Sequence, residues 1–415
     1  MSNLPIDWEF DTFENLGIQI IDGDRGNNYP KQNEFMQEGY CLFLSAKNVT
    51  KRGFEFIEKQ FISEEKDSLL RKGKLSKGDL VLTTRGTVGN VAFFNDSIKY
   101  DNIRINSGMV LLRVSDNVDN LFLYKIMTSD FIQQYIQNIA FGSAQPQLTV
   151  KEIKKFQIPL PPLEEQKKIA DILSTVDKKI AFVEENINAT EELKKGLMQK
   201  LLTEGIGHTE FKDSELGRIP ESWEVVQFDK VCDIRDGTHD SPKYIESGIP
   251  FITSKHLTDN GIDFTETNYI SKENHIEFSK RSKVDNGDIL FGMIGTIGKP
   301  IIVNTDFEFS IKNIALLKLS CNELLSNIYV LNLLKSNIIT KQFSKLSNGG
   351  VQSFIALGMI RKLKIPLPPL EEQKQIAEIL LTIDNKLENL KDKKLFFEEL
   401  KKGLMQKLLT AEVRV

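Results

Sequence analysis

A long sequence that occurs twice constrains the fold of this chain more than any other feature. Residues 158–180 and 365–387 are identical at 17 of 23 positions, and ELKKGLMQKLLT follows unchanged at 192–203 and 399–410. Both pairs lie 207 positions apart, so neither copy has gained or lost a residue. A repeat of this length and identity indicates that the chain is two copies of one unit of about 200 residues.

Each copy of the repeat predicts a long helix. Proline precedes the acidic residues Glu164 and Glu165, an arrangement typical of a helix N-terminus. Apolar residues then recur at alternating steps of four and three, which is the seam of a coiled coil. The predicted seam residues are Ile169, Leu173, Val176, Ile180, Val183 and Ile187 in the first copy and Ile376, Leu380, Ile383, Leu387 and Leu390 in the second.

The apolar stripe of such a helix needs a packing partner. The nearest candidate is the other copy of the repeat in the same chain. A solvent-exposed helix, or a zipper between two chains, is the alternative. At 1.5 Å per residue, a helix of about 40 residues would extend roughly 60 Å.

The segments that precede the helices predict two compact globular halves. Each half is rich in short β-forming runs that glycine, asparagine and aspartate interrupt. The halves resemble each other weakly, since GDLVLTTRGTVGN at 78–90 parallels GDILFGMIGTIGK at 287–299 while most other positions differ. We therefore predict an α+β fold in which mixed α/β halves at 1–157 and 205–364 are followed by repeated helices at 158–204 and 365–415.

Composition is that of an ordinary globular protein. Hydrophobic residues make up 40% of the chain and charged residues 27%. No apolar run approaches the roughly 18–20 residues that a membrane helix needs, and MSNLPIDWEF is not typical of a signal peptide. Cys41, Cys232 and Cys321 lack metal-ligand spacing and predict small buried thiols in a reducing compartment. We expect a cytoplasmic protein without a membrane partner.

The net charge argues against a strongly basic nucleic-acid binder. The chain carries a net charge of −4, and residues 1–157 and 205–364 each contain 19 Lys and Arg against 20 Asp and Glu. DNA binding usually leaves a basic footprint. Any DNA affinity must therefore come from local patches, or from a partner that supplies most of the phosphate contacts.

No arrangement of residues in the sequence is typical of a catalytic or metal site. GMIGTIGKP at 292–300 resembles a phosphate-binding loop, but its glycines are one residue too far apart and Pro300 replaces the Ser or Thr that would hold magnesium. The four histidines show no metal-ligand spacing, and none lies before His208. The pair Glu164–Glu165 recurs in both copies at a helix start, where the helix dipole explains it. We predict no catalytic residue and no metal ligand.

Polar residues on short loops are the remaining functional candidates. Lys, Arg, Thr, Asn, Gln and His match the donors and acceptors of base edges, although an ordinary solvated loop residue is the alternative for each. Lys47 and Lys255, Thr87 and Thr296, and Gln145 and Gln352 occupy matched positions. We match Arg85 with Met293, so we expect a base contact that differs between the halves. The predicted DNA-contacting residues are Lys47, Asn48, Arg85, Thr87 and Gln145 in the first half and Thr238, His239, Lys243, Lys255, His256, Thr296 and Gln352 in the second.

Two divergent halves, each followed by a copied helix that begins IPLPPLEEQ and ends LKKGLMQKLL, resemble the specificity subunit of type I restriction–modification enzymes. The resemblance covers the whole chain. The duplicated PLPPLEEQ start is specific to it, whereas DGTH at 236–239 is weaker support. It implies that each half is a target recognition domain reading one part of a split, asymmetric DNA sequence. It also implies that the two helices pack as an antiparallel coiled coil within an internal pseudo-two-fold repeat.

The resemblance implies the partners and cofactors as well. The partners would be double-stranded DNA, two modification (methyltransferase) subunits and restriction (motor-nuclease) subunits. This chain would be a non-catalytic subunit that binds no cofactor. S-adenosylmethionine would belong to the modification subunits, and ATP and magnesium to the restriction subunit. A spacer of roughly 60 Å is a little under two turns of DNA at about 34–36 Å each, so two half-sites could lie on one face of the duplex.

Two other functions are compatible with the sequence. The first is a coiled-coil scaffold whose globular halves bind proteins. The second is an enzyme with an unrecognised site, against which the absence of a duplicated catalytic constellation argues. Divergent halves beside copied helices favour the DNA-reading subunit over both.

Overall fold

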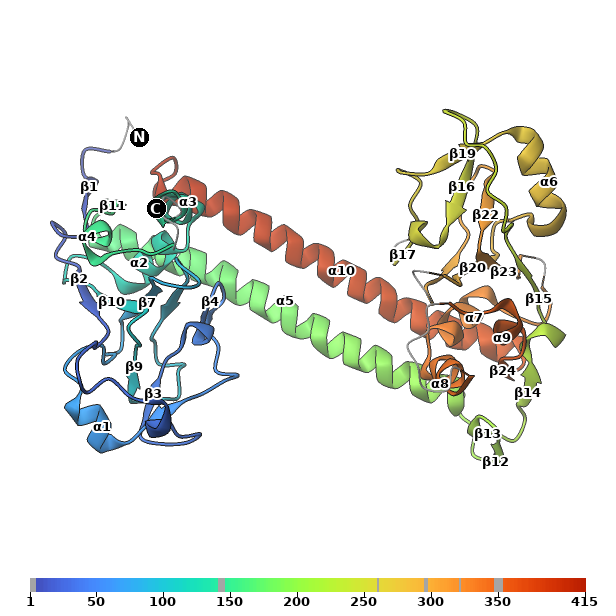
Figure 1. The fold of residues 1–415 in the computed structure, drawn as a ribbon, viewed down its shortest axis with the longest axis horizontal. Helices are drawn as coiled ribbons and strands as arrows, with labels where there is room; N and C mark the ends of the chain where they lie inside the picture. The colour runs from blue at the N-terminus through green and yellow to red at the C-terminus, as the bar shows by residue number, and fades with distance from the viewer. Residues whose placement is uncertain (1–4, 141–145, 260, 295–297, 321, 347–353) are drawn as a thin grey trace. The chain divides into compact units, whose positions relative to one another are not determined.

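A computed structural model of the chain describes residues 5–140, 146–259, 261–294, 298–320, 322–346 and 354–415 (Figure 1). The chain divides into two compact units. Unit 1 comprises Met1–Glu184 and Lys393–Val415, and unit 2 comprises Glu185–Asp392. Unit 1 is therefore built from two separate stretches of the chain, whereas unit 2 is one continuous stretch.

The first half of the chain has short strands and helices followed by one long helix. In chain order they are β1 (Glu9–Thr12), β2 (Gln19–Asp22), η1 (Gln32–Glu34), β3 (Cys41–Phe43), η2 (Ala46–Asn48), β4 (Val49–Thr50), β5 (Gly53–Phe54), β6 (Phe61–Ile62), α1 (Glu64–Leu69), β7 (Leu80–Thr83), β8 (Val91–Phe93), β9 (Ile103–Arg104), β10 (Met109–Arg113), α2 (Asn120–Met127), α3 (Asp130–Ala140), α4 (Val150–Ile153), β11 (Gln157–Leu160) and α5 (Leu163–Thr203).

The elements that follow repeat this series after one additional hairpin. They are β12 (Phe211–Ser214), β13 (Gly217–Pro220), β14 (Glu224–Gln227), η3 (Phe228–Lys230), β15 (Asp233–Asp236), β16 (Ile249–Thr253), η4 (Ser254–His256), β17 (Leu257–Thr258), β18 (Gly261–Ile262), β19 (Asn268–Ile270), α6 (Lys272–Ser282), β20 (Ile289–Gly292), β21 (Pro300–Ile302), β22 (Ser310–Lys312), β23 (Ile314–Lys318), α7 (Asn327–Leu334), α8 (Asn337–Leu346), α9 (Leu357–Arg361), β24 (Lys364–Leu367) and α10 (Leu370–Leu409).

The sheets of the two units have the same strand order. A four-stranded antiparallel sheet runs β2-β10-β7-β8 in unit 1 and β15-β23-β20-β21 in unit 2. A three-stranded sheet runs β6-β3-β9 and β19-β16-β22, with one parallel pairing in each. Strand β1 pairs with β11, and β14 pairs with β24. The mixed α+β fold with an internal repeat, predicted from the sequence, is confirmed by this match.

The core of each unit lies between its four-stranded sheet and the long helices. Central strands such as β7 and β20 are buried at all four positions, which is typical of strands covered on both faces. The core of unit 1 also contains the start of α5, through Ile169 and Leu173, and the end of α10, through Leu408. The core of unit 2 contains the start of α10 and the end of α5.

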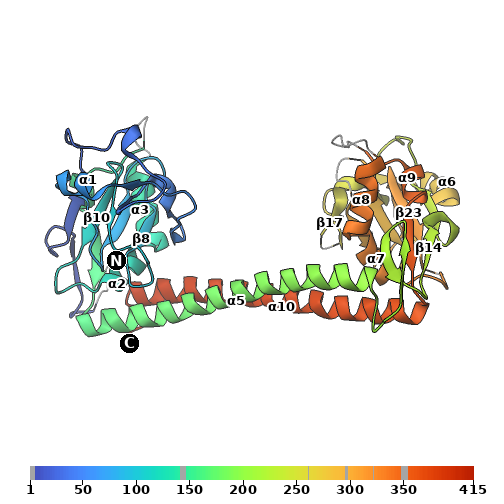
Figure 2. The same ribbon diagram turned by 90° about the horizontal axis from the view of Figure 1, so that it is seen from below.

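Helices α5 and α10, of 41 and 40 residues, therefore pack antiparallel within each unit (Figures 1 and 2). All eleven predicted seam residues are buried or partly buried, Ile180, Ile383 and Leu390 being the partly buried ones. Glu184 and Lys394 form an ion pair between the helices in unit 1, and Lys194 and Asp384 form one in unit 2. Among the described residues, no helix is long and apolar enough to cross a membrane.

Candidate nucleic-acid interface

The sequence predicts twelve DNA-contacting residues, of which Gln145, Thr296 and Gln352 lie outside the described residues. The other nine lie on four connecting segments between strands. Two of these segments belong to unit 1, namely η2 and the β7–β8 turn. The other two belong to unit 2, namely η4 and the segment after β15.

The short helices η2 and η4 are built in the same way. In η2 the Ser45 N–H donates to Asn48 Oδ1 at 2.9 Å. In η4 the Thr253 N–H donates to His256 Nδ1 at 2.9 Å. Each forms a capping box, in which the side chain of the third helical residue returns to the residue before the helix. Matched positions in the sequence thus occupy matched positions in the two units.

Asn48 and His256 are buried, with 2% and 4% of their surface exposed. Asn48 Nδ2 donates to the backbone oxygen of Glu58 at 2.7 Å, and His256 Nε2 lies 3.3 Å from that of Glu266. Burial lowers the pKa of His256, so the ring is neutral at neutral pH. These contacts give both residues a structural role. DNA contact by Asn48 and His256 stays a prediction, one that requires the turns to open.

The lysines beside these anchors, Lys47 and Lys255, are exposed. Lys47 Nζ lies 2.7 Å from Glu58 Oε2 in an ion pair whose two side chains are 70% and 65% exposed. An ion pair this exposed contributes little to stability, and the lysine can exchange its partner. DNA contact by either lysine stays a prediction.

Arg85 and Thr87 lie on the turn between β7 and β8, where Gly86 and Gly89 adopt positive φ angles of 75° and 97°. The Arg85 N–H donates to the Gly108 oxygen at 3.2 Å, which holds the backbone in place. Both side chains are exposed.

The predicted match of Arg85 with Met293 is wrong, because Ile294 lies at the equivalent place in unit 2. Arg85 forms an isolated bridge with Gln147, and Ile294 forms the equivalent bridge with Phe354. Ile294 is 47% exposed, whereas Met293 is buried. The two units thus present different chemistry at this position.

Thr238, His239 and Lys243 follow β15, and the structure brings Asp236, Asn313 and Arg281 to the same place. His239 Nε2 lies 2.9 Å from Asp236 Oδ2, and Nδ1 lies 2.6 Å from Asn313 Oδ1. Asp236 also forms an ion pair with Arg281. Thr238 is buried and accepts the Asp240 N–H at 3.1 Å, while His239 and Lys243 are exposed.

Sequence reasoning missed Asp236, Asn313 and Arg281. The Asp-Gly dipeptide of DGTH is a turn signal and could have pointed to Asp236. Arg281 ends α6, and Asn313 lies between β22 and β23, 77 positions beyond Asp236. No local pattern connects these residues, because only the fold brings them together.

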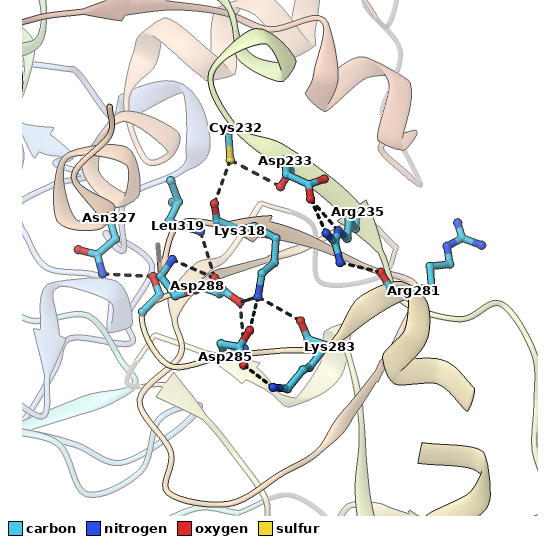
Figure 3. Close-up of polar contacts among 12 residues, drawn as sticks. Cys232, Asp233, Arg235, Arg281, Lys283, Asp285, Asp288, Lys318, Leu319 and Asn327 are labelled. Atoms are coloured by element: carbon cyan, nitrogen blue, oxygen red, sulfur yellow. Dashed lines mark hydrogen bonds and ion pairs between the residues drawn. The ribbon is translucent and has the colours of Figure 1, made fainter. Parts of the chain in front are cut away.

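The aspartates of the repeated Gly-Asp pair, Asp79 and Asp288, organise the four-stranded sheets. Asp288 is fully buried, accepts the Leu319 N–H at 3.0 Å and pairs with Lys318 of β23 (Figure 3). Asp79 is paired in the same way, since Arg113 Nη2 of β10 lies 2.7 Å from Asp79 Oδ2. Because a cation on the neighbouring strand neutralises each carboxylate, both residues hold the sheet together.

The cysteines and carboxylates of the described residues offer no reactive centre. Burial raises the pKa of Cys41 and of Cys232 to about 12, so both thiols are protonated and unreactive at neutral pH. Cys321 lies outside the described residues. Among the residues that the structure does describe, no three His, Cys, Asp or Glu side chains are grouped to hold a metal ion.

The glutamine of the repeated PLPPLEEQ motif connects each long helix to its globular half. Gln166 Oε1 accepts the Asp119 N–H at 2.8 Å, and Gln373 Oε1 accepts the Ser326 N–H at 2.9 Å. Asp119 and Ser326 are the N-cap residues of α2 and α7. Both glutamines are buried, so each holds the N-terminus of α2 or α7 against the start of the long helix.

The second glutamate of the motif contacts the tryptophan of its unit. Trp8 Nε1 donates to Glu165 Oε2 at 3.2 Å, and Trp223 Nε1 donates to Glu372 Oε2 at 2.9 Å. The sequence explains Glu164 and Glu165 by the helix start alone. That explanation suits exposed Glu164, but for Glu165 it is incomplete, because Glu165 is 6% exposed and is also bound by other side chains. The PLPPLEEQ motif is therefore a joint between helix and globular half.

The residues that complete this joint differ between the units. In unit 1, Arg414 Nη2 donates to Glu165 Oε2 at 2.7 Å and also pairs with Asp7. In unit 2, His208 Nε2 lies 2.8 Å from Glu372 Oε1. The hydrogen bond from Arg414 holds the pKa of Glu165 below its usual range. We call these two clusters the Trp–Glu joints.

A buried ion pair strengthens the contact between helix and globular half in unit 1. Lys125 of α2 has a side chain that is 5% exposed, and its Nζ lies 2.5 Å from Asp177 Oδ2 of α5. Asp177 also pairs with Lys401 of α10 at 2.7 Å. In unit 2 the matching aspartate, Asp384, pairs with Lys194, while buried Asn332 stands where unit 1 has Lys125.

Known proteins match this arrangement along the whole chain. The family model of the type I restriction modification DNA specificity domain matches residues 5–192 and again residues 220–395. The type I restriction enzyme MjaVIII specificity subunit of Methanocaldococcus jannaschii is 31% identical over 398 residues, which cover 91% of this chain and 87% of that protein. The EcoBI specificity subunit of Escherichia coli is 23% identical and covers 82% of this chain and 75% of its own length.

Two solved structures share the fold. The HsdS subunit from Thermoanaerobacter tengcongensis covers 99% of this chain and 98% of its own, with a TM-score of 0.51 and 20% identity. The type I restriction–modification S subunit from M. genitalium covers the same shares, with a TM-score of 0.58 and 18% identity. The repeated order of sheets and long helices is thus also found in solved proteins of this size.

Proposed function

The chain belongs to the family of type I restriction modification DNA specificity domains, and we propose that its two units read the two parts of one split DNA sequence. As a specificity subunit it serves DNA target recognition in a type I restriction–modification system. One observation carries the proposal of a split target. The two units share one strand order, yet the side chains on their exposed turns differ, as Arg85 and Ile294 do. Two units with the same strand order but different side chains on their turns can read two different half-sites of an asymmetric target.

We propose that the repeated helices bind two modification (methyltransferase) subunits. Apolar side chains on these helices support the proposal, because large exposed apolar residues mark protein interfaces. Leu193 of α5 and Leu400 of α10, which are 207 positions apart, are 48% and 38% exposed. Leucine at the same repeat position of two helices would offer each modification subunit the same surface. We propose restriction subunits as further members of the complex.

The partner subunits would also supply most of the phosphate contacts and all of the cofactors. A net charge of −4 suits a reader whose partners contribute most phosphate contacts. We assign S-adenosylmethionine to the modification subunits and ATP with magnesium to the restriction subunits, so that this chain binds double-stranded DNA without a cofactor and without catalysing a reaction. The complex would work in the cytoplasm, where its DNA substrate lies.

Methylation mapping tests the proposal. The chain would be expressed with the modification subunit encoded beside it, and methyladenine would be mapped across the host genome. We expect a split motif with a fixed gap that appears only when this chain is present. Replacing residues 1–155 with the equivalent segment of another specificity subunit should change one half of the motif and leave the other half unchanged.

Two results would contradict the proposal. If an active modification subunit methylates the same sites with and without this chain, the chain does not set specificity and the protein-binding scaffold is the better account. If the replacement of residues 1–155 alters both halves of the motif, the two units do not read separate half-sites.

A further inference from the structure

A turn that begins with Asp-Gly follows the edge strand of the four-stranded sheet in both units. We call it the DG turn, residues 22–26 in unit 1 and 236–240 in unit 2. Strand β2 pairs Asp22 with Val110 of β10, and strand β15 pairs Asp236 with Ala315 of β23. The two turns therefore start at the same place on the same sheet, although they share only the letters Asp-Gly.

The two DG turns have the same internal construction. A Cβ on Gly23 would lie 2.2 Å from the Asn106 backbone oxygen, and one on Gly237 would lie 2.3 Å from that of Ile311, so both positions require glycine. The next residue is buried and accepts an N–H from two positions ahead. Asp24 Oδ1 accepts from Gly26 at 2.8 Å, and Thr238 Oγ1 accepts from Asp240 at 3.1 Å. A rigid turn of this kind can hold a side chain in one orientation.

In unit 1 the turn presents an arginine that a carboxylate orients. Arg25 Nη2 lies 3.1 Å from Asp22 Oδ1 and 3.3 Å from the Ser107 backbone oxygen. Both hydrogen bonds that Arg25 makes with the described residues use Nη2, so its Nε–H and Nη1–H donors are available for a ligand. The Arg25 side chain is 48% exposed.

In unit 2 the first aspartate of the turn also orients an arginine. Arg281, at the end of α6, uses Nη2 to pair with Asp236 Oδ1, and its side chain is 59% exposed while that of Asp236 is 7% exposed. Figure 3 shows the Arg281 guanidinium directed away from the Asp288–Lys318 network of the sheet. His239 takes the turn position of Arg25 and binds the other oxygen, Asp236 Oδ2.

We propose that Arg25 in unit 1 and Arg281 in unit 2 each read a guanine in the major groove of the DNA target. This inference rests on the proposed function. A guanidinium that is held along one edge can direct two N–H donors at O6 and N7 of guanine, which is the commonest specific contact between arginine and DNA. Each half of the recognised sequence then contains at least one G·C pair. Because the arginine comes from a different element in each unit, the guanine can occupy a different position in each half.

The paired aspartates favour a base contact over a phosphate contact. Asp22 and Asp236 each place a negative charge in direct contact with the guanidinium, which would repel a phosphate group. A base edge carries no net charge, so the carboxylate can orient the arginine without opposing the ligand. Orientation matters here because discrimination between bases depends on the direction of the donors.

Substitution by lysine distinguishes the two kinds of contact. Lysine keeps the positive charge but loses the planar pair of donors. We expect Arg25→Lys, in the full chain with its modification subunit, to accept other bases at one guanine position, with discrimination lowered about 5- to 150-fold. Arg281→Lys should do the same in the other half only. Methylation rates on DNA duplexes that carry guanine or another base at each position give the ratio.

Two matched controls lie in exposed ion pairs that take no part in a DG turn. Lys364 of β24, paired with Glu215 at 3.2 Å, is the control for unit 2. Lys154, paired with Glu14 at 2.9 Å, is the control for unit 1. Lys364→Arg and Lys154→Arg should keep the full discrimination of the native chain.

Three outcomes would overturn the inference while leaving the proposed function intact. The first is a mapped motif in which one half lacks a G·C pair. The second is that the lysine variants of Arg25 and Arg281 discriminate between bases as well as the native chain does. The third is that alanine variants of these arginines weaken binding to all DNA sequences equally and lower the salt dependence of binding by about one phosphate contact. If the native complex itself methylates no split motif, the proposed function fails and this inference fails with it.

Discussion

Units 1 and 2 share a strand order and a joint motif, yet they complete the joint differently. The glutamate of PLPPLEEQ binds a tryptophan in both units, but Arg414 completes the cluster in unit 1 and His208 completes it in unit 2. Lys125 adds a buried ion pair in unit 1 that unit 2 lacks. Repeated residues therefore determine where the helix meets the globular half, while the surrounding contacts have diverged along with the turns.

The two tryptophans of the chain allow this comparison to be measured. Trp8 belongs to unit 1 and Trp223 to unit 2, and 6% and 0% of their surfaces are exposed. A Trp223→Phe background leaves fluorescence from unit 1 alone, and a Trp8→Phe background leaves that from unit 2. Urea unfolding can thus be followed separately for each unit.

The largest difference should come from the matched aspartates of the repeated helices. Asp177→Asn leaves Lys125 buried without a full counter-charge, so we expect the free energy of unfolding of unit 1 to fall by about 3 kcal/mol. Asp384→Asn removes a more exposed ion pair and should change unit 2 by about 1 kcal/mol or less. Urea unfolding in the two single-tryptophan backgrounds measures both values.

The double variant Lys125→Met/Asp177→Asn is the control, because methionine fills the site without a charge. It should recover most of the stability that Asp177→Asn loses. Equal losses for Asp177→Asn and Asp384→Asn would instead mean that Lys125 does not distinguish the two units.

A smaller difference should come from the glutamates of the Trp–Glu joints. Glu165→Gln removes the carboxylate that accepts from Arg414, and we expect unit 1 to lose about 2 kcal/mol. Glu372→Gln should cost unit 2 about 1 kcal/mol, since the amide oxygen can still accept from Trp223 and no arginine loses a carboxylate partner. The same fluorescence measurement applies, and a larger loss in unit 2 than in unit 1 would contradict this order.

The contact between Arg414 and Glu165 also makes the stability of unit 1 depend on pH. Because Arg414 lowers the pKa of Glu165 in the folded protein, the stabilisation is fully present above the usual value of 4.5 and is lost as the pH falls through the folded value. Between pH 7 and pH 3, unit 1 of the native chain should therefore lose more stability than unit 1 of Glu165→Gln. Parallel pH dependence in the two proteins would rule out the Arg414 contact as the cause.

The smallest effect on stability should come from the matched lysines of η2 and η4. Lys47→Ala and Lys255→Ala remove exposed side chains, so each unit should keep its free energy of unfolding within about 0.5 kcal/mol. If each lysine contacts a phosphate, the slope of DNA affinity against salt concentration should fall by about 1 in either variant. An unchanged slope in both variants would remove η2 and η4 from the DNA-binding surface.

Elements with a repeating pattern could be predicted from the sequence. The alternating steps of four and three predict α5 and α10, and Ile169, Leu173, Ile376 and Leu380 lie fully buried in the cores of their units. The match between Lys47 and Lys255 predicted two equivalent turns, and the structure places both lysines in equivalent short helices. Periodicity and repetition are local properties of a sequence, which is why they could be read directly.

Contacts between distant residues could not be predicted. Arg414 and Glu165 are 249 positions apart, so no local pattern shows that the carboxylate has a partner other than the helix dipole. Asn48 and His256 have side chains that suit base contacts, and their burial depends on backbone oxygens up to ten positions further along the chain. The two DG turns share only two letters, because hydrogen bonds and close backbone packing, rather than residue identity, preserve their shape.

The division of the chain into one continuous and one discontinuous unit has a consequence for synthesis on the ribosome. Unit 2, Glu185–Asp392, leaves the ribosome as one uninterrupted stretch, and all the residues of its core are then present. Unit 1 needs Leu408 and Leu409 of α10 to complete its core, and these residues are translated after the whole of unit 2. Most of unit 1 is therefore translated first, but its core is completed only after the whole of unit 2 has been translated.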